Sequence, residues 1–334
     1  MNLIDKIKNK ARGYNLSLVL PETQDIRVLK AAEIIIKEKF TKKLVLLGSP
    51  DELLKRAKDN LINLDGVEFV DYMQAPNRQK YIEMYFQSRQ SKGITMEEAA
   101  KTLEDPIFYG MFMVKENEID TIVSGSLATT ANVLRAALHV IGLSPANRTL
   151  SSCFLMVVPD CAYGEEGALL YADAGCVPDP NAEQLADIAI TTANTARILL
   201  ETEPRVAMLS FSTKGSAQHR SIEKVIKATE IVKQKAPDIL IDGELQADAA
   251  LVPEIAKKKL SDSPVAGRAN VLIFPDLNSG NICYKLTERL AKAQAYGPLV
   301  QGSAKPVSDL SRGCSVMDIV NVSAIMLLRT GVQK

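Results

Sequence analysis

Apolar and polar positions follow two alternating patterns along most of the chain. Short apolar runs rich in β-branched residues are typical of buried strands, and most are followed by stretches with helical spacing. This alternation predicts an α/β fold, with parallel sheets covered by helices on both faces. Residues 169–172 add a candidate hairpin partner for the strand before them. The predicted strands are residues 16–20, 44–47, 67–70, 121–123, 153–158, 205–210, 239–241 and 271–274, and the predicted helices are 27–38, 131–141, 181–201, 222–235 and 286–296.

The chain of 334 residues is long for a single core and fits two domains better. Proline and asparagine interrupt the pattern at residues 143–147, and Gly297-Pro298 interrupts it again. We therefore expect a discontinuous first domain, residues 1–144 with 298–334, and an inserted second domain, residues 145–297. In such proteins a ligand binds in the cleft, at the carboxyl ends of strands.

Composition excludes several classes of function. Lys plus Arg and Asp plus Glu balance at 40 each, so no bulk field attracts nucleic acid or an acidic membrane. No segment approaches the roughly 20 apolar residues of a membrane span. The N-terminal residues have mixed charge and no apolar core, unlike a signal peptide. We expect a cytoplasmic protein that binds neither nucleic acid nor membrane.

Cysteine and histidine usage narrows the chemistry. Five cysteines are an odd count and none are spaced as C-x-x-C, which disfavours both a disulfide framework and a zinc knuckle. Only His139 and His219 are present, which disfavours a His-based triad or a His-rich metal site. We expect no bound metal, and a carboxylate rather than a histidine as any general base.

Residues 306–318 carry the densest chemistry of the chain. Hydroxyls, a thiol and two carboxylates surround Arg312 and Gly313, directly before an apolar helical run. A loop that opens a helix presents N–H groups and a positive dipole end to an anion, and an arginine fork suits phosphate oxygens. Two other interpretations stay open: Ser315 and Asp318 also fit a capping box, and Arg312 fits a surface ion pair.

A second polar loop, residues 123–130, leads into a helix that carries Arg135. Five residues separate Thr130 from Arg135, about one and a half helical turns, which would bring Arg135 near the mouth of this loop. The hydroxyls of Thr129 and Thr130 fit helix capping equally well. Arg89 is a third candidate cation, although its polar helix also fits simple exposure. The chain has neither a Gly-Lys dipeptide nor G-x-G-x-x-G, so the common nucleotide loops are missing.

These loops resemble, in this order, the phosphate acetyltransferase (phosphotransacetylase) family. The resemblance covers essentially the whole chain, in the short form without the family's N-terminal regulatory extension. It implies two three-layer α/β domains of the isocitrate/isopropylmalate-dehydrogenase type with a cleft between them, and a homodimer. The implied reaction interconverts acetyl-CoA plus phosphate with acetyl phosphate plus CoA; CoA is a substrate and no cofactor is needed. The motifs that carry it are Pro21-Glu22 with Asp25-Ile26-Arg27, and residues 209–217, 242–246, 270–281 and 306–319.

The resemblance also implies roles for individual residues. Asp318 would be the general base, Ser311 would hydrogen-bond the reacting thiol or thioester, and Arg312 would hold the phosphoryl oxygens. The substrate-binding residues would be Arg135, Thr130, Thr129, Arg89 and Gly313, of which Arg89 matches a CoA-contacting arginine. The CoA thiolate would attack directly in a ternary complex, without a metal or an enzyme nucleophile.

Three alternatives remain at this stage. A phosphate butyryltransferase, or another phosphate acyltransferase, would differ only in the lining of the acyl pocket. The family's butyryl-specific relatives lack much of the context of residues 309–313, which favours acetyl. A CoA- or acetyl-phosphate-binding module without activity is the second alternative, against which the intact Ser311, Arg312 and Asp318 argue. A dehydrogenase of the same general fold is the third, without a dinucleotide loop to support it.

Overall fold

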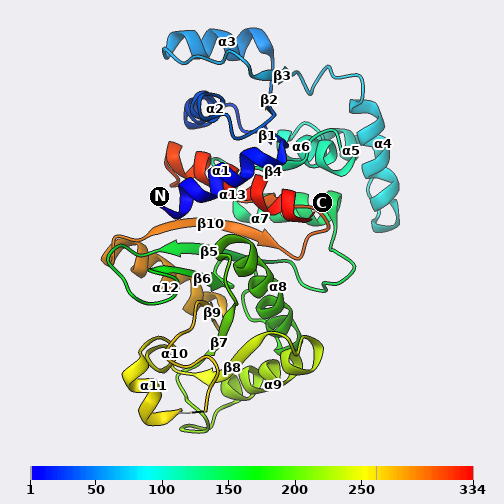
Figure 1. Cartoon of the computed structure of the whole chain (residues 1–334). Coiled ribbons are helices and arrows are strands. Elements are labelled where there is room, and N and C mark those ends of the chain that lie inside the picture. Colours follow the sequence, from blue (N-terminus) through cyan, green and yellow to red (C-terminus); the bar gives the residue numbers. More distant parts are fainter. Residues whose placement is uncertain (1, 261, 334) are drawn as a thin grey trace. The chain divides into compact units, whose positions relative to one another are not determined.

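The computed structural model describes residues 2–260 and 262–333, and these divide into two compact units (Figure 1). Unit 1 runs to Gly142 and resumes at Ser303, and unit 2 spans Leu143–Gly302. The sequence boundary predicted at Gly297-Pro298 falls inside a strand, β10 (Gln294–Gln301). This strand pairs along its length with β5 (Ser151–Val157), which keeps its residues in unit 2.

Unit 1 contains a sheet in the order β3-β2-β1-β4-β11. Every pairing between these neighbours is parallel, as predicted from the strand–helix alternation. All residues of β1 and β4 are buried, so helices cover both faces of the sheet. The strands are β1 (Ser17–Leu20), β2 (Lys43–Leu47), β3 (Glu68–Val70), β4 (Thr121–Val123) and β11 (Val307–Ser308).

The last helix of the chain, α13 (Val316–Gln333), lies in the core of unit 1. It packs against α1 (Leu3–Tyr14), α2 (Ile26–Glu38) and β4. By length and composition alone it meets the criteria for a membrane span, but 67% of that stretch is buried, as in a core helix. The other helices of unit 1 are α3 (Pro50–Asp59), α4 (Arg78–Arg89), η1 (Gln90–Lys92), α5 (Met96–Thr102), α6 (Pro106–Lys115), α7 (Thr130–Ala136) and the π-helical turn η2 (Ala137–Ile141).

Unit 2 contains a mixed sheet in the order β10-β5-β6-β9-β7-β8. The predicted hairpin is confirmed, since β5 and β6 pair antiparallel. The antiparallel β10 was not predicted, whereas β6, β9, β7 and β8 pair in parallel. The remaining elements are β6 (Ala168–Ala172), β7 (Arg205–Leu209), β8 (Leu240–Leu245), β9 (Val271–Ile273), α8 (Ala182–Leu200), α9 (Arg220–Lys235), α10 (Ala247–Leu251), α11 (Pro253–Lys259) and α12 (Leu277–Leu290).

The predicted helix 286–296 is wrong at both ends. Helix α12 begins nine residues earlier, at Leu277, directly after Asp276, whose Oδ1 accepts the N–H of Ser279 at 2.8 Å, and it ends at Leu290. The small polar residues of its first turn read as a loop in the sequence. Its apolar residues Ile282, Leu286 and Leu290 are 57%, 53% and 80% exposed, so this part of its apolar pattern lies on an open face.

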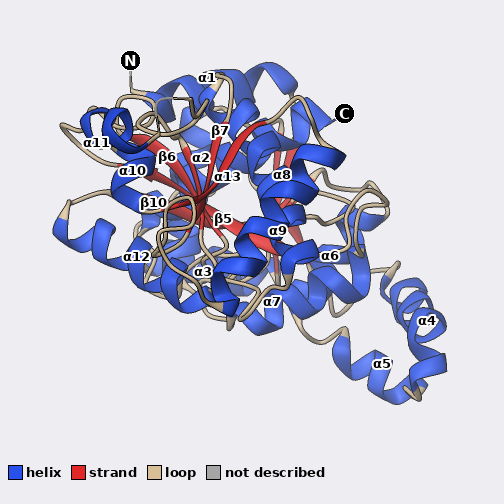
Figure 2. Cartoon of the chain, turned by 90° about the horizontal axis from the view of Figure 1, so that it is seen from below, coloured by secondary structure: helices blue, strands red, loops and turns tan. Residues whose placement is uncertain are grey.

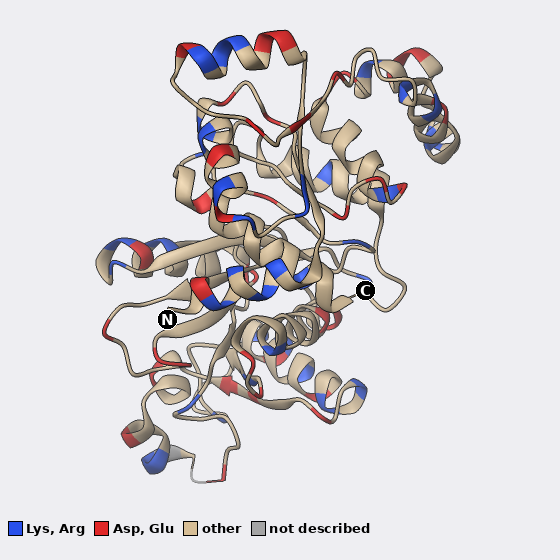
Figure 3. Cartoon of the chain, turned by 45° about the horizontal axis from the view of Figure 1, so that its top comes forward, with Lys and Arg blue, Asp and Glu red and all other residues tan. Residues whose placement is uncertain are grey.

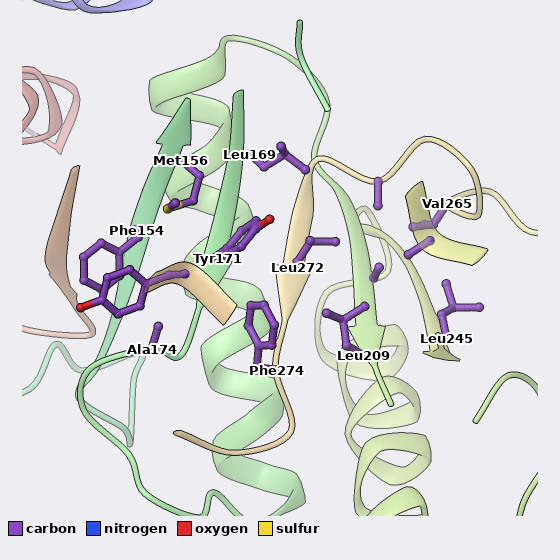
Figure 4. Close-up of a cluster of buried hydrophobic side chains, with 14 of the residues drawn as sticks. Phe154, Met156, Leu169, Tyr171, Ala174, Leu209, Leu245, Val265, Leu272 and Phe274 are labelled. Carbon is purple, nitrogen blue, oxygen red and sulfur yellow. The ribbon is translucent and has the colours of Figure 1, made fainter. Parts of the chain in front are cut away.

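The core of unit 2 combines aliphatic side chains with two pairs of aromatic rings (Figure 4). The rings of Phe154 and Tyr284 stack with centroids 4.0 Å apart, and Tyr171 and Phe274 pack at 5.4 Å. Strands lie between helices (Figure 2). The surface helix α3 carries acids in its first turn and bases in its last, so both signs of charge lie on one helix (Figure 3). The core and the balanced surface both fit the α/β fold that the sequence predicts.

Candidate active site

Helix α13 begins in a capping box formed by Ser315 and Asp318. Oδ2 of Asp318 accepts the N–H of Ser315 at 2.7 Å and its hydroxyl at 2.8 Å, and the Ser315 hydroxyl oxygen accepts the N–H of Asp318 at 3.1 Å. The capping interpretation that the sequence left open is therefore correct. Oδ1 of Asp318 has no hydrogen bond among the described residues and the side chain is half-buried. Capping orients the carboxylate and leaves one oxygen available.

The turn before this helix presents two candidate catalytic side chains to solvent. The carbonyl of Ser311 accepts the N–H of Cys314 at 2.8 Å, and Oγ of Ser311 accepts the N–H of Gly313 at 3.3 Å. Both Ser311 and Arg312 are exposed. A Cβ on Gly313 would meet only Oγ of Ser311, at an ordinary 3.7 Å, so the fold does not itself require glycine there.

Cys314 is held as an unreactive thiol. It is 7% exposed, and burial raises its pKa to about 11, although nearby Arg27 acts in the opposite direction. Nucleophilic cysteines have a lowered pKa because the thiolate is the reactive form. The environment of Cys314 therefore fits a structural residue and not an acyl-accepting nucleophile.

Asp309 is a buried acid in the same loop that the sequence did not single out as a site residue. Neither carboxyl oxygen has a well-formed hydrogen bond among the described residues, and the side chain lies against Gly125. Burial raises the pKa of Asp309 to about 7, while the Thr130 hydroxyl lowers it and the charge of Glu22 raises it further. The acid thus titrates near neutral pH, behind the exposed turn.

The loop of residues 123–130 forms an anion-binding nest whose anion belongs to the protein. Glu22, at the end of β1, accepts the N–H groups of four successive residues, at 2.5, 2.8, 3.0 and 2.7 Å. It is 4% exposed. Successive backbone N–H groups attract anions in this way. A substrate phosphate therefore cannot use these donors without displacing Glu22. The donors belong to Gly125, Ser126, Leu127 and Ala128.

Thr129 and Thr130 stand at the start of α7. Oγ1 of Thr129 accepts the N–H of Asn132 at 3.3 Å, so Thr129 caps the helix as the alternative interpretation proposed. Thr130 is the first helical residue and faces Asp309. Because Glu22 occupies the backbone donors, a role in substrate binding for either threonine rests on its hydroxyl.

In unit 2, another loop after a strand also binds a carboxylate of the protein. Glu244, on β8, accepts the hydroxyl of Ser212 at 3.0 Å and the N–H of Gly215 at 2.7 Å. Beside it, the ammonium group of Lys214 bonds Oδ1 of Asp242 at 2.5 Å. Polar residues of loop 209–217, one of the motifs that carry the resemblance, therefore bind carboxylates of the neighbouring strand.

Arg89 and Arg135 line one pocket of about 620 Å³ in unit 1. Arg135 lies 5.7 Å from the ring centre of Phe108 and donates to Oδ1 of Asn132 at 2.5 Å. Lys92 and Lys101 add two cations. With one acid among the lining residues, the pocket suits an anionic ligand. It is lined by Tyr85, Arg89, Lys92, Gly93, Ile94, Glu98, Lys101, Thr102, Phe108, Arg135 and His139.

His139 is held neutral at the wall of this pocket. Its pKa is lowered by burial first, and then by the charges of Arg89 and Arg135. Its Nδ1 lies 3.0 Å from the hydroxyl of Tyr85, whose pKa burial raises. The imidazole therefore adds an aromatic surface and a hydrogen bond to the pocket, without adding a charge.

Helix α7 connects the pocket with the loop of residues 309–318. Thr130, at its start, faces Asp309, and Arg135, one and a half turns further along, lines the pocket. At 1.5 Å per residue this separation is roughly 7–8 Å along the helix axis. The sequence prediction that Arg135 lies near the mouth of loop 123–130 agrees with this path.

Three functional candidates escaped the sequence reasoning. Glu22 and Arg27 were named only as parts of a motif, without a predicted role. Asp309 was included only as one residue of loop 306–318. Their common signal is a charged side chain in the segment after a buried strand, either within two residues of its carboxyl end or in the first turn of the next helix. In parallel α/β sheets that edge is where ligand-binding loops gather.

Comparison with known proteins identifies the family. Residues 2–327 match the model of the phosphate acetyl/butaryl transferase family. The chain is 50% identical to a phosphate acetyltransferase of Acetivibrio thermocellus (97% of each chain covered) and 51% identical to that of Thermoanaerobacterium thermosaccharolyticum (97% and 98%). A phosphotransacetylase structure from Streptococcus pyogenes superposes with a TM-score of 0.92, at 38% identity over 99% and 98% of the two chains. The chain therefore belongs to the phosphate acetyl/butaryl transferase family.

Proposed function

We propose that this protein is a phosphate acetyltransferase, which interconverts acetyl-CoA plus phosphate with CoA plus acetyl phosphate. The observation that carries the proposal is the match over nearly the whole chain to relatives that bear this name. Two features of unit 1 support it: a pocket rich in cations, and an exposed turn with a hydroxyl and a guanidinium beside a capped carboxylate.

The pocket fits the phosphate groups of CoA. Arg89 and Arg135 present planar forks, which bind phosphate oxygens in pairs, and Lys92 and Lys101 add charge. Tyr85, Phe108 and the neutral His139 give apolar and aromatic surface for the rest of a nucleotide. Arg89 and Arg135 therefore remain substrate-binding residues of the proposal. Thr129, Thr130 and Gly313 do not line this pocket, and their part in the proposal rests on the family resemblance.

Asp318 takes the thiol proton in the proposed reaction. The thiolate sulfur of CoA then attacks the carbonyl carbon of acetyl phosphate and forms the thioester bond. The bond between that carbon and the bridging oxygen breaks, and its electron pair leaves with phosphate. Oδ1 of Asp318 is the oxygen not used in the capping box, so the carboxylate can accept a proton without uncapping the helix.

In this transfer, Ser311 and Arg312 stabilise the negative charges that develop on the reacting atoms. The Arg312 guanidinium is exposed, without a hydrogen bond or ion pair among the described residues, and so is ready to hold phosphoryl oxygens. The Ser311 hydroxyl lies on the same turn and can bond the reacting sulfur. Fixed donors of this kind are typically worth about 3–4 kcal/mol each in the transition state.

Acetyl is the favoured acyl group because the relatives that cover the chain are named for acetyl transfer. The family description also names butyryl transfer, which a difference of a few methylene groups in the acyl pocket would select. The exposed Ser311 and Arg312, with the oriented Asp318, argue against a binding module that has lost its chemistry.

A homodimer is part of the proposal, and the exposed face of α12 supports it. Ile282, Leu286 and Leu290 are spaced four residues apart on that face. Lys285 and Glu288 lie close to this stripe in the sequence. A second copy in the antiparallel direction would cover the apolar stripe and bring opposite charges together. Cytoplasmic location remains a prediction, based on cysteine usage and composition.

A direct assay tests the function. Purified protein is mixed with CoA and acetyl phosphate, and thioester absorbance is followed with time. Parallel reactions contain butyryl phosphate, or NAD with a hydroxy acid. Thioester formation that is fastest with acetyl phosphate supports the proposal. Faster transfer from butyryl phosphate, or turnover only with NAD, contradicts it.

A further inference from the structure

We propose that Arg27 is a positioning residue, which holds the turn of Ser311 and Arg312 in register with loop 123–130. The inference rests on the proposed function, because it concerns the geometry of that same site. Arg27 lies in the first turn of α2, the helix that follows β1, far in sequence from both segments it joins.

The Arg27 side chain binds backbone carbonyls of two separate loops. Nη1 donates to the carbonyl of Arg312 at 3.0 Å and to that of Cys314 at 2.6 Å. Nη2 donates to the carbonyl of Ser126 at 2.9 Å. One rigid, planar group therefore fixes two points of the candidate catalytic turn and one point of loop 123–130.

Asp25 orients the guanidinium. It accepts from Nε of Arg27 through both oxygens at 3.0 Å, and from Nη2 at 2.7 Å, while its Oδ1 also caps α2 through the N–H of Arg27. Burial alone would raise the pKa of Asp25, but the bonds from Arg27 outweigh burial and lower it. The pair is well shielded, with side chains 27% and 6% exposed.

Arg27 has no donor left for a substrate. A guanidinium carries five N–H groups, and Nε, Nη1 and Nη2 use them on Asp25 and the three carbonyls. This separates Arg27 from Arg312, whose guanidinium is exposed. Arg27 therefore acts through the backbone of other residues.

The turn needs such support because little else holds it. Between Ser308, the end of β11, and Val316, the start of α13, no residue is in a helix or strand. Its internal backbone hydrogen bond joins Cys314 to Ser311. Active-site groups must be held to within about half an ångström, and a misplacement of about 1 Å can cost a hundredfold in rate.

The test compares Arg27→Met with Arg12→Met in the full chain. Arg12 is a matched control, because it also bonds two backbone carbonyls, those of Glu38 and Lys39, but away from the turn. Arg27→Lys and Asp25→Asn complete a graded series, since Asn still caps α2. For each variant, kcat, KM for CoA and Tm are measured with CoA and acetyl phosphate.

We expect kcat to fall about a hundredfold in Arg27→Met, somewhat less in Arg27→Lys and about tenfold in Asp25→Asn. KM for CoA should stay within about threefold, because the pocket of Arg89 and Arg135 does not use Arg27. Arg12→Met should lower Tm without changing kcat. A folded Arg27→Lys or Asp25→Asn with normal kcat overturns the inference, even if Arg27→Met fails to fold. Lack of wild-type turnover would instead refute the proposed function.

Discussion

The backbone of Gly125 lies directly against the carboxyl group of Asp309, with no space for a Cβ between them. A Cβ built on Gly125 would overlap Oδ1 of Asp309 and approach the backbone nitrogen of Leu310 at 2.6 Å. Gly125 also has a φ of +101°, in the region that favours glycine. At this contact, loop 123–130 meets the strand end that leads to the candidate catalytic turn.

Replacement of Gly125 by alanine should therefore destabilise the fold by at least about 2 kcal/mol, from backbone strain plus overlap. Gly93→Ala is the control, since Gly93 has φ +86° and ψ 11°, in the left-handed helical region, but no atom within 4 Å of an added Cβ. It should cost about 1 kcal/mol. Urea unfolding measures both. Equal stability of the two variants would show that the contact at Gly125 can relax.

Asp309 should make stability depend on pH. A carboxyl whose pKa rises from 3.8 to about 7 on folding binds more protons in the native state between these pH values. The native state therefore loses stability as pH rises from about 4 to 7, by an amount on the order of a few kcal/mol.

Asp309→Asn should remove this dependence, because asparagine stays neutral. Relative to the wild type, the variant should gain free energy of unfolding at pH 8 and gain little at pH 4. Urea titrations at both pH values measure the difference. If the free energies of unfolding of the wild type and the variant differ by the same amount at both pH values, the pKa of Asp309 is not raised.

Asp318→Asn should reduce kcat at least about a hundredfold while folding is retained, because asparagine can still accept the N–H of Ser315 but cannot take a proton. Arg312→Ala should cost a similar factor, since its exposed guanidinium does not hold the fold together. Circular dichroism and Tm establish folding. Near-normal turnover in either folded variant would remove that residue from the mechanism.

Cys314→Ala should keep substantial activity. The thiol is buried with a pKa of about 11 and is almost fully protonated at neutral pH. Acid quenching during turnover, followed by mass spectrometry, should find no acetyl group on the protein. An acetylated Cys314 would replace direct transfer by a covalent route.

Loss of either pocket arginine should weaken CoA binding. Hydrogen bonds to charged groups are worth about 1.5–3 kcal/mol, so Arg89→Met or Arg135→Met should raise Kd for CoA roughly ten- to a hundredfold. Isothermal titration measures Kd. Arg12→Met serves again as the control, because neither Arg12 nor the residues whose carbonyls it bonds, Glu38 and Lys39, line the pocket. Unchanged affinity in both pocket variants would place the CoA phosphates elsewhere.

The sequence predicted the elements with clear periodicity and missed those that depend on tertiary context. Strand 121–123 matches β4, because a buried parallel strand is apolar on both faces. Strand β10 was missed because Gly297 and Pro298 lie within it, and the register of its pairing shifts there, between Tyr296 and Leu299. Glycine and proline in a sequence predict the end of a strand unless its partner strand is known.

The candidate site shows the same division. The capping box of Ser315 and Asp318 could be predicted from the sequence, because capping depends on a spacing of three residues. The binding of the Glu22 carboxylate by loop 123–130 could not be predicted from the sequence, since Glu22 lies about a hundred residues away along the chain. A polar loop after a strand indicates where anions bind, but whether that anion is a substrate or a side chain depends on the tertiary fold.

The position of α13 has a consequence for biosynthesis. During translation, unit 2 is complete when Gly302 has left the ribosome, whereas unit 1 still lacks β11 and its central helix. Until β11 and α13 have been synthesised, β4 has an open edge, and α1, α2 and the sheet lack the apolar surface of α13 that covers them. Because domains fold as units, residues 1–142 of unit 1 must wait for residues 303–334 before the unit can fold. The Arg27 contacts to residues 312 and 314 can form only at that last stage, so the candidate site is assembled when residues 303–334 dock onto the rest of unit 1.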